Sequence, residues 1–391
     1  MKTRIINILF LTFAIIASTE GQEADSLMKL VLEQNKELKV AREAYQVSIL
    51  QAGTGNTPSD PEVEFGYLYG KPSDLGNRID FGVTQELDFP TAYIHRSKVK
   101  NIKYTRAELE YVLIRQEVML QTRQLWIDKI HLNQLSMLLS KRLQQAQTIH
   151  THVQYQLDAG EVGLLEFGQS NLQVASMEAE FEGVLSQLEN NRIALMELTG
   201  GTPVEIRDTL FPIPVQIIPD TVLEAYRIGP YTQIHEQGIQ LKEEEKNLAV
   251  SMHMPKLTAG YFSESVVDQA FRGFRVGLSL PLWENANTVN KAKTDVAFAE
   301  AALDRFTFQQ ERELRQKLNQ LETLQLRVTK LEEALGLANS ISLLTHAIEN
   351  GEISLSEYFY NSDFYFRNQQ QLLLYKRDLL LQEADLLKVY L

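Results

Sequence analysis

The sequence predicts a mainly α-helical protein that also contributes strands to a membrane β-barrel. It predicts two tandem repeats, each with a strand pair followed by a long helical hairpin. Three observations support this fold class. The chain carries the same signals twice in the same order, its longest segments lack glycine and proline, and the segments before them alternate apolar with polar residues.

The repeat is visible at two dissimilar places. Residues 61–67 (PEVEFGY) return as 255–261 (PKLTAGY), 194 residues later. Residues 160–167 (GEVGLLEF) return as 351–358 (GEISLSEY), 191 residues later. Solenoid units have periods of ~20–50 residues, so this spacing indicates a duplicated half-protein.

The duplication sets the expected domain boundaries. We expect a first repeat over residues 22–201, a proline-containing linker over 202–220 and a second repeat over 221–391. Residues 1–21 have the pattern of a secretory signal peptide, with Lys2 and Arg4 before a short apolar run and small residues near Gly21. That run is shorter than the ~20 apolar residues of a membrane span.

The distribution of glycine and proline predicts very long helices. No glycine or proline occurs from Thr91 to Ala159, and an unbroken helix there would be roughly 100 Å long. The second copy, from Glu284 to Asn350, has Gly336 as its only interruption. A heptad of apolar residues within it predicts left-handed supercoiling against a partner helix, which a dimeric coiled coil would show as well. The heptad positions are Leu314, Leu321, Val328 and Leu335.

Four strands are expected, over residues 62–70, 78–88, 256–264 and 272–282. Each alternates apolar with polar residues, as in transmembrane barrel strands of ~9–11 residues, although a half-buried soluble sheet alternates in the same way. A transmembrane barrel needs at least ~8 strands, and an open edge in lipid would leave backbone groups unpaired, so several chains would have to share one barrel. The residues expected to face lipid are Val63, Phe65, Phe81, Val83, Val276 and Leu278.

Each long hairpin is expected to end in a tight tip, near residues 158–166 and 349–357. Gly160 suits a left-handed backbone at the helix end. Ser354 and Glu357 form a capping box, of which the first copy keeps Glu166 opposite Gly163. The tips are expected to expose residues 162–164 and 353–355, which suits a docking contact better than catalysis. A purely structural turn is the alternative.

Composition excludes several other functions. The chain has no cysteine, so it has no disulfide framework, thiolate metal site or N-terminal lipid on a cysteine. The net charge of −13, with acidic and basic residues interspersed, excludes a nucleic-acid surface. We expect residues 252–254 (MHM) to be a packed helix end rather than a copper site, and residues 243–245 (EEE) to be a solvated helix face. No catalytic motif occurs, and neither an enzyme, a metal site nor a cofactor is expected.

The signal peptide, the duplicated strand pairs, the long helices and the paired tips resemble the TolC-type outer membrane efflux proteins over essentially the whole mature chain. That family forms homotrimers with a 12-stranded barrel in outer membrane lipid and a periplasmic tunnel. The resemblance implies a trimeric α/β-barrel channel-tunnel in a Gram-negative outer membrane, with residues 202–220 at the waist of the tunnel. It implies a periplasmic adaptor and an inner-membrane pump of the RND type as partners.

The resemblance also implies functional residues. The adaptor would dock on the tips, at Gly160, Glu161, Val162, Gly163, Leu164, Gly351, Glu352, Ile353, Ser354 and Leu355. In a trimer, the acidic residues of the tips would surround a narrow pore mouth. These candidates are Asp158, Glu161, Glu349 and Glu352. Residues 86–93 (ELDFPTAY) are similar to the barrel-exit segment of members that export heavy metals, which suggests heavy-metal cations as cargo.

Two other classes of protein are alternatives. Periplasmic adaptor proteins also have a signal peptide and long helices, but they contain a single hairpin between the halves of a small β-domain. A secreted coiled-coil scaffold would explain neither the strands nor the duplication. The sequence therefore favours an outer membrane channel that gives a passive exit duct to a tripartite efflux system.

Overall fold

The computed structural model describes residues 22–72, 75–267, 269–337 and 340–391, so the expected signal peptide at 1–21 lies outside the described residues. The chain divides into two compact units. The first unit takes in the residues up to Val40 together with Ile114–Ala225 and Glu311–Leu391, and the second takes in Ala41–Leu113 and Tyr226–Gln310.

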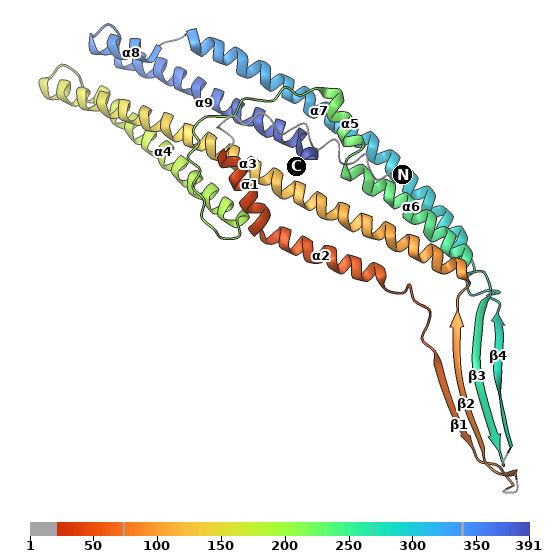
Figure 1. Cartoon of the computed structure of the whole chain (residues 1–391). Helices are drawn as coiled ribbons and strands as arrows, with labels where there is room; N and C mark the ends of the chain where they lie inside the picture. Colours follow the sequence, from red (N-terminus) through yellow and green to blue (C-terminus); the bar gives the residue numbers. More distant parts are fainter. Residues whose placement is uncertain (1–21, 73–74, 268, 338–339) are drawn as a thin grey trace. The chain divides into compact units, whose positions relative to one another are not determined.

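The order of elements is duplicated, with two helices, a strand pair, a very long helix and a return helix in each half of the chain (Figure 1). The first half contains α1 (Gln22–Gln34), α2 (Lys36–Gly53), β1 (Glu62–Leu68), β2 (Arg78–Leu87), α3 (Pro90–Ala159) and α4 (Leu164–Leu198). The second half contains α5 (Pro219–Arg227), α6 (Pro230–Ser251), β3 (Lys256–Val266), β4 (Gln269–Ser279), α7 (Thr288–Leu337), α8 (Ser340–Glu349), α9 (Leu355–Leu386) and the short 3-10 helix η3 (Lys388–Tyr390). The chain is thus mainly helical with one small sheet, as expected.

Proline and glycine set the ends of several helices. Pro90, Pro219 and Pro230 each open a helix, where the missing N–H has no intrahelical partner to lose. The 70 residues of α3 form one unbroken helix because no glycine or proline occurs within it after Pro90. In the second copy, α7 is described up to Leu337 and α8 from Ser340, and residues 338–339 between them lie outside the described residues. Gly336 lies inside α7, next to its last described residue.

Within the described residues, no helix has both the length and the apolar character needed to cross a membrane.

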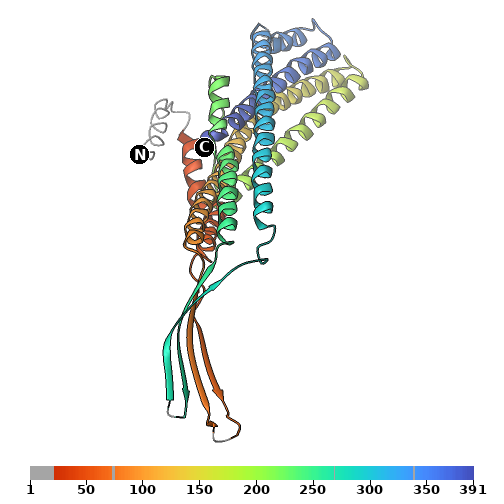
Figure 2. The same cartoon turned by 90° about the vertical axis from the view of Figure 1, so that its right-hand side faces the viewer.

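The four strands form one antiparallel sheet in chain order within the second unit (Figure 2). The register pairs Val63 with Val83, Val83 with Tyr261, and Tyr261 with Phe274. Because residues that pair directly point to the same side, the apolar faces of all four strands coincide. The sheet therefore has one mainly apolar face, which also carries Gln85, Ser263, Ser265 and Arg272, and one mainly polar face.

The bounds of the second strand pair differ from the expected 256–264 and 272–282. The ladder already pairs Val266 with Gln269, so both strands reach a tight connection, and β4 stops at Ser279. Pro281 follows shortly after and cannot donate to a ladder. Leu280 and Leu282, which were expected inside the strand, lie beyond it.

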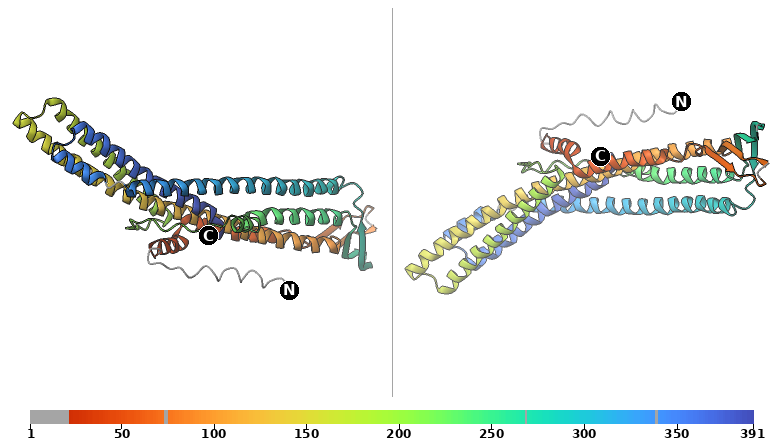
Figure 3. Two further views of the ribbon diagram at one scale, coloured as in Figure 1. Left: turned by 90° about the horizontal axis from the view of Figure 1, so that it is seen from above. Right: turned by 90° about the horizontal axis from the view of Figure 1, so that it is seen from below.

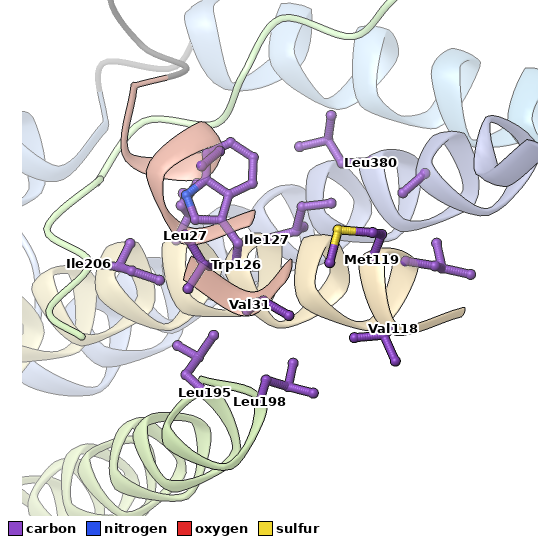
Figure 4. Close-up of a cluster of buried hydrophobic side chains, with 14 of the residues drawn as sticks. Leu27, Val31, Val118, Met119, Trp126, Ile127, Leu195, Leu198, Ile206 and Leu380 are labelled. Carbon is purple, nitrogen blue, oxygen red and sulfur yellow. The ribbon is translucent and has the colours of Figure 1, made fainter. Parts of the chain in front are cut away.

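The largest apolar core of the first unit gathers side chains from six segments (Figure 4). Trp126 and Ile127 of α3 lie in this core, together with Leu195 of α4. It also includes Leu27, Val31, Leu38, Leu198, Ile206 and Leu380. The core therefore packs α1, the start of α2, α4, α9 and the inter-repeat linker against the middle of α3.

The linker is also held by hydrogen bonds, although residues 203–218 contain no helix or strand. The Trp126 indole N–H donates to the carboxylate of Asp208 at 3.1 Å. The Val215 amide donates to the carboxylate of Glu383 at 3.0 Å, and Arg123 lies 3.7 Å from the same carboxylate. Burial raises the pKa of Glu383, and the Val215 amide and Arg123 oppose this shift.

The heptad residues of α7 find their partner helix within the same chain. Leu314, Leu321 and Val328 are buried. Beside them, Lys376 of α9 pairs with Glu332 at 2.5 Å, Lys317 of α7 pairs with Asp385, and the Arg327 guanidinium lies 5.5 Å from the ring centre of Tyr375. The heptad therefore does not require a dimeric coiled coil.

One histidine in the first unit is buried without a full set of partners. His131 of α3 is 6% exposed, and its Nδ1 has no hydrogen-bond partner among the described residues. Burial lowers the pKa of His131 to about 4, and nearby Arg377 adds to the shift. The ring is therefore neutral near pH 7 in the folded protein.

We predict that this histidine makes the helical part sensitive to acid. The folded state binds the proton more weakly than the unfolded chain, whose histidine pKa is 6.5. The stability that the neutral His131 contributes is therefore complete above pH 6.5. As the pH falls toward 4, the free energy of unfolding decreases by about 3 kcal/mol. Replacing His131 with Gln should flatten the decline in the free energy of unfolding, measured by urea denaturation in detergent. The same change at the exposed His152 should leave the decline as it is, and equal effects would contradict the assignment.

Candidate functional site

The two hairpin tips, residues 158–166 and 349–357, end their helices in the same way. Gly160 and Gly351 adopt φ angles of 73° and 70°, the left-handed region that was expected at Gly160. The Glu161 amide donates to the carbonyl of Gln156 at 2.9 Å, and the Glu352 amide donates to that of Ala347 at 2.8 Å. With the glycine amides bonded one residue further on, this is a Schellman motif in both copies.

The helices that follow are capped unequally, again as expected. In the second tip, the Glu357 amide donates to Ser354 Oγ at 3.2 Å, and the Ser354 amide donates to the Glu357 carboxylate at 2.9 Å. In the first tip only the second bond exists, from the Gly163 amide to Glu166 at 3.1 Å, because glycine has no side chain. Each tip is nevertheless a closed turn with a fixed backbone.

The tips differ from the expectation in what they expose. Val162, Ile353 and Leu355 are partly buried against a cluster formed by Ile149, Val153 and Tyr358. Val162 and Ile353 directly precede the capping residues, which is the position of a hydrophobic staple, and such residues turn inward. Figure 3 shows the two tips side by side at one end of the first unit. Leu164 is exposed as expected, at 78%, and its neighbour Leu165 is exposed as well, at 71%.

The acidic candidates at the tips point to solvent as far as they are described. Asp158, Glu161 and Glu352 are exposed, and Asp158 accepts a bond from Gln154 at 2.9 Å. The side chain of Glu349 lies outside the described set. Neither Glu161 nor Glu352 caps the following helix, which Glu166 and Glu357 do.

An ionic layer between the two hairpins was not predicted from the sequence. Arg142 of α3 is 6% exposed and binds Asp363 of α9 at 2.5 Å and Glu180 of α4 at 3.5 Å. Its guanidinium lies 5.4 Å from the ring centre of Phe366. The layer ties the two hairpins to each other, and the only signal in the sequence was an arginine within a mostly apolar seam.

The sheet brings the six residues expected to face lipid onto its apolar face. Val63 pairs with Val83 and Phe65 with Phe81, while Val276 and Leu278 share the face through Ala259 and Leu257. Phe65, Val276 and Leu278 are each at least 66% exposed. A large apolar surface is therefore uncovered in the single chain.

The opposite face of the sheet carries charges and glycines. Arg78 lies 2.8 Å from Asp80 and 3.3 Å from Glu264, and Lys256 lies 3.1 Å from Glu86. A Cβ on Gly82 would lie 3.1 Å from the ring of Phe262, and one on Gly260 would lie 2.9 Å from it. These glycines make room for the one aromatic ring that departs from the polar pattern of β3.

The helices next to the sheet hold a second ionic cluster, which corrects one expectation. Glu244 is not fully solvated but lies 2.7 Å from His95 and 3.1 Å from Lys98. Arg96 binds Asp88 at 2.6 Å, and the sulfur of Met252 lies 3.6 Å from the same guanidinium. Met252 therefore contacts this cluster, whereas His253 and Met254 are exposed. No group of three His, Cys, Asp or Glu residues that could hold a metal ion occurs among the described residues.

No protein-family model matches this sequence. No curated protein matches it either. Among solved structures, the Campylobacter jejuni CmeC outer membrane channel superposes with a TM-score of 0.77 at 18% identity, over 94% of this chain and 85% of that one. The Vibrio cholerae outer membrane protein VceC gives 0.77 at 15% identity, over 95% and 98%. The open state of the Neisseria gonorrhoeae MtrE outer membrane channel gives 0.70 at 15%, over 94% and 88%. At these identities the likeness concerns the fold.

Proposed function

We propose, from the premise that this chain has the fold of the TolC-type outer membrane efflux channels, that three copies form a passive exit duct of a tripartite efflux system. The observation that carries the proposal is the sheet, which is apolar on one face, polar on the other and unpaired at both edges among the described residues. Such a sheet suits lipid outside and water inside. Four strands are too few to close around a pore, whereas three copies supply twelve.

The same premise gives the other parts of the system. The long hairpins would form a periplasmic tunnel, residues 1–21 would direct secretion, and the tips would dock on a periplasmic adaptor that connects to an inner-membrane pump of the RND type. The two repeats with strands before each hairpin favour the channel over an adaptor or a secreted scaffold. Membrane fractionation tests this directly, because a heat-modifiable oligomer in the outer membrane supports the channel, and a soluble or inner-membrane protein contradicts it.

The cargo is a narrower proposal. Residues 86–93 resemble a segment of heavy-metal exporters, yet Asp88 of this segment binds Arg96 and its amide donates to the Tyr93 hydroxyl at 3.1 Å. These contacts stabilise the chain at the end of β2. We propose that the pump, and not this segment, decides which cargo is exported. Co-purification of the pump and adaptor would test for heavy-metal cations.

We predict that the two faces of β2 respond differently to a charge. Phe81→Arg places a guanidinium on the apolar face, where a charge at the bilayer midplane costs roughly 2–4 kcal/mol, so the amount of assembled oligomer should fall. Thr84→Arg, on the opposite face of the same strand, should be tolerated. Heat-modifiability gels of outer membranes measure both variants, and equal losses would mean that the faces are assigned wrongly.

The tips suit adaptor docking because their backbone is fixed and their outer surface is small and accessible. Gly163 and Ser354 occupy the same place in the two copies and are both exposed. A Cβ on Gly163 would lie 3.2 Å from a carboxylate oxygen of Glu166. A serine at this position could donate a hydrogen bond to that oxygen, as the Ser354 hydroxyl donates to Glu357.

Gly163→Glu should therefore abolish efflux, since it adds a third carboxylate beside Glu161 and Glu166 and blocks close approach of a partner. Gly163→Ser copies the second tip and should keep efflux. Both should leave the membrane level and the oligomer unchanged. Export is measured by the minimal inhibitory concentration of a pump substrate. Normal export by the glutamate variant at normal protein level would refute docking at the tips.

The acids of the tips would form a ring of twelve carboxylates in a trimer, three each of Asp158, Glu161, Glu349 and Glu352. Like charges around a narrow mouth attract cations. Asp158→Asn combined with Glu349→Gln should lower the cation preference and weaken block by divalent ions in planar bilayers. The matched control is Glu178→Gln, an exposed acid on α4 away from the tip. Unchanged selectivity and block in the double variant would show that the ring does not line the pore.

A further inference from the structure

We propose that neighbouring copies join β4 of one chain to β1 of the next in a single register, with Arg275 opposite Gly66 and beside Glu64. The inference rests on the proposed trimeric barrel and specifies its seam. It starts from the sheet order, in which β1 and β4 each have a neighbour on one side only. Strands alternate in direction across the sheet, so β4 can meet another β1 in an antiparallel pair and continue the pattern.

Charge is the first evidence that the partner is a second copy. The cations inside the sheet are already paired, Arg78 with Asp80 and Glu264 and Lys256 with Glu86. On the polar face of the described sheet, charges of opposite sign without an ion pair remain at opposite edges, whereas Arg272 of β4 lies on the other face. On β4, Arg275 has no ion pair with any described residue and lies 4.0 Å from the ring centre of Phe262. On β1, Glu62 and Glu64 likewise have no ion pair within the described chain.

The two faces of the sheet restrict the register. An apolar face that continues across the seam requires even-numbered residues of β4 to oppose odd-numbered residues of β1, since Phe274 and Val276 share a face with Phe65. A slip by one residue would turn apolar side chains to the polar side. The allowed registers therefore differ in steps of two residues.

The tilt of barrel strands narrows the choice further. A line across the sheet from Glu62 passes through Thr84 and Gly260 to Arg275. Twelve strands spaced ~4.8 Å apart and tilted ~35–45° need a total stagger of roughly 12–18 residues, or about 4–6 for each copy. Registers that place Glu62 or Glu64 directly opposite Arg275 correspond to a stagger of zero or two residues for each copy. The strands would then be tilted less than the strands of transmembrane barrels.

A stagger of four residues for each copy keeps apolar residues on one face of the seam and polar residues on the other. It places every residue of β1 opposite a residue of β4, from Glu62 opposite Ser279 to Leu68 opposite Gly273. On the apolar face it pairs Phe65 with Val276 and Tyr67 with Phe274. On the polar face Arg275 lies opposite Gly66, which leaves space for the guanidinium to reach Glu64 diagonally. A stagger of six would place Glu62 opposite Pro281, which has no N–H, and Arg275 opposite Leu68.

Disulfide trapping tests the register in the full-length protein, which has no native cysteine. Paired positions alternate between close and wide spacing along an antiparallel ladder, so two adjacent pairs are needed. These are Phe65→Cys with Val276→Cys, and Gly66→Cys with Arg275→Cys. The controls shift one cysteine by two residues, joining Phe65→Cys with Phe274→Cys or with Leu278→Cys. Cells are treated with a mild oxidant, and outer membranes are run on non-reducing gels.

We expect a ladder of dimer and trimer from at least one of the two predicted pairs and several-fold less from both controls. A stronger ladder from either control, or none from any pair in a protein that is still trimeric, overturns the register but leaves the channel standing. A protein that forms no trimer even without the substitutions overturns the proposed function and the seam together.

A charge swap tests the contact between Arg275 and Glu64 without cysteines. Arg275→Glu should lower the temperature at which the trimer dissociates on heat-modifiability gels, and adding Glu64→Arg should restore most of the loss. The swap does not restore the contact of Arg275 with Phe262 inside the chain, so recovery reports the seam. A double variant no better than the single one would contradict the contact.

Discussion

The open edges of the four-stranded sheet are the main constraint on this chain, because β1 and β4 each have a neighbour on one side only among the described residues. A row of N–H and C=O groups that faces hydrocarbon costs several kcal/mol for each group without a partner. The exposed Phe65 and Val276 lie on one face of this sheet, which could not be stable in lipid while its edges stay open. In the proposed trimer, closure into a barrel would remove both edges, and each copy would contribute an even number of strands.

The hairpin tips follow a second principle, which is that an exposed turn can be rigid without being large. Each tip combines a left-handed glycine, a Schellman motif and a carboxylate that caps the next helix. Val162 and Ile353 anchor the turns from inside, and the Arg142 layer fixes the two hairpins to each other. A surface with this little conformational freedom loses little entropy when a partner binds, which is what a docking site requires.

The alternation of apolar and polar residues and the positions of glycine and proline were enough to predict the four strands, the uninterrupted α3 and the left-handed Gly160, because those features depend on neighbouring residues. Features that depend on distant residues were not predictable. The inward orientation of Val162, the ion pairs of Arg142 and the half-buried Glu244 arise only when α3 packs against α4, α6 or α9. The bounds of β4 were wrong because the ladder with β3, rather than the local pattern, decides where the strand ends.

In the proposed barrel, closure of the sheet requires three copies of this chain. Native mass spectrometry of the protein, extracted from outer membranes in a mild detergent, measures the number of copies. We expect a complex with three times the mass of the mature chain, which converts to single chains only when the barrel is unfolded by heat. A monomer with an intact sheet, or a complex of any other copy number, would rule out a barrel of three chains.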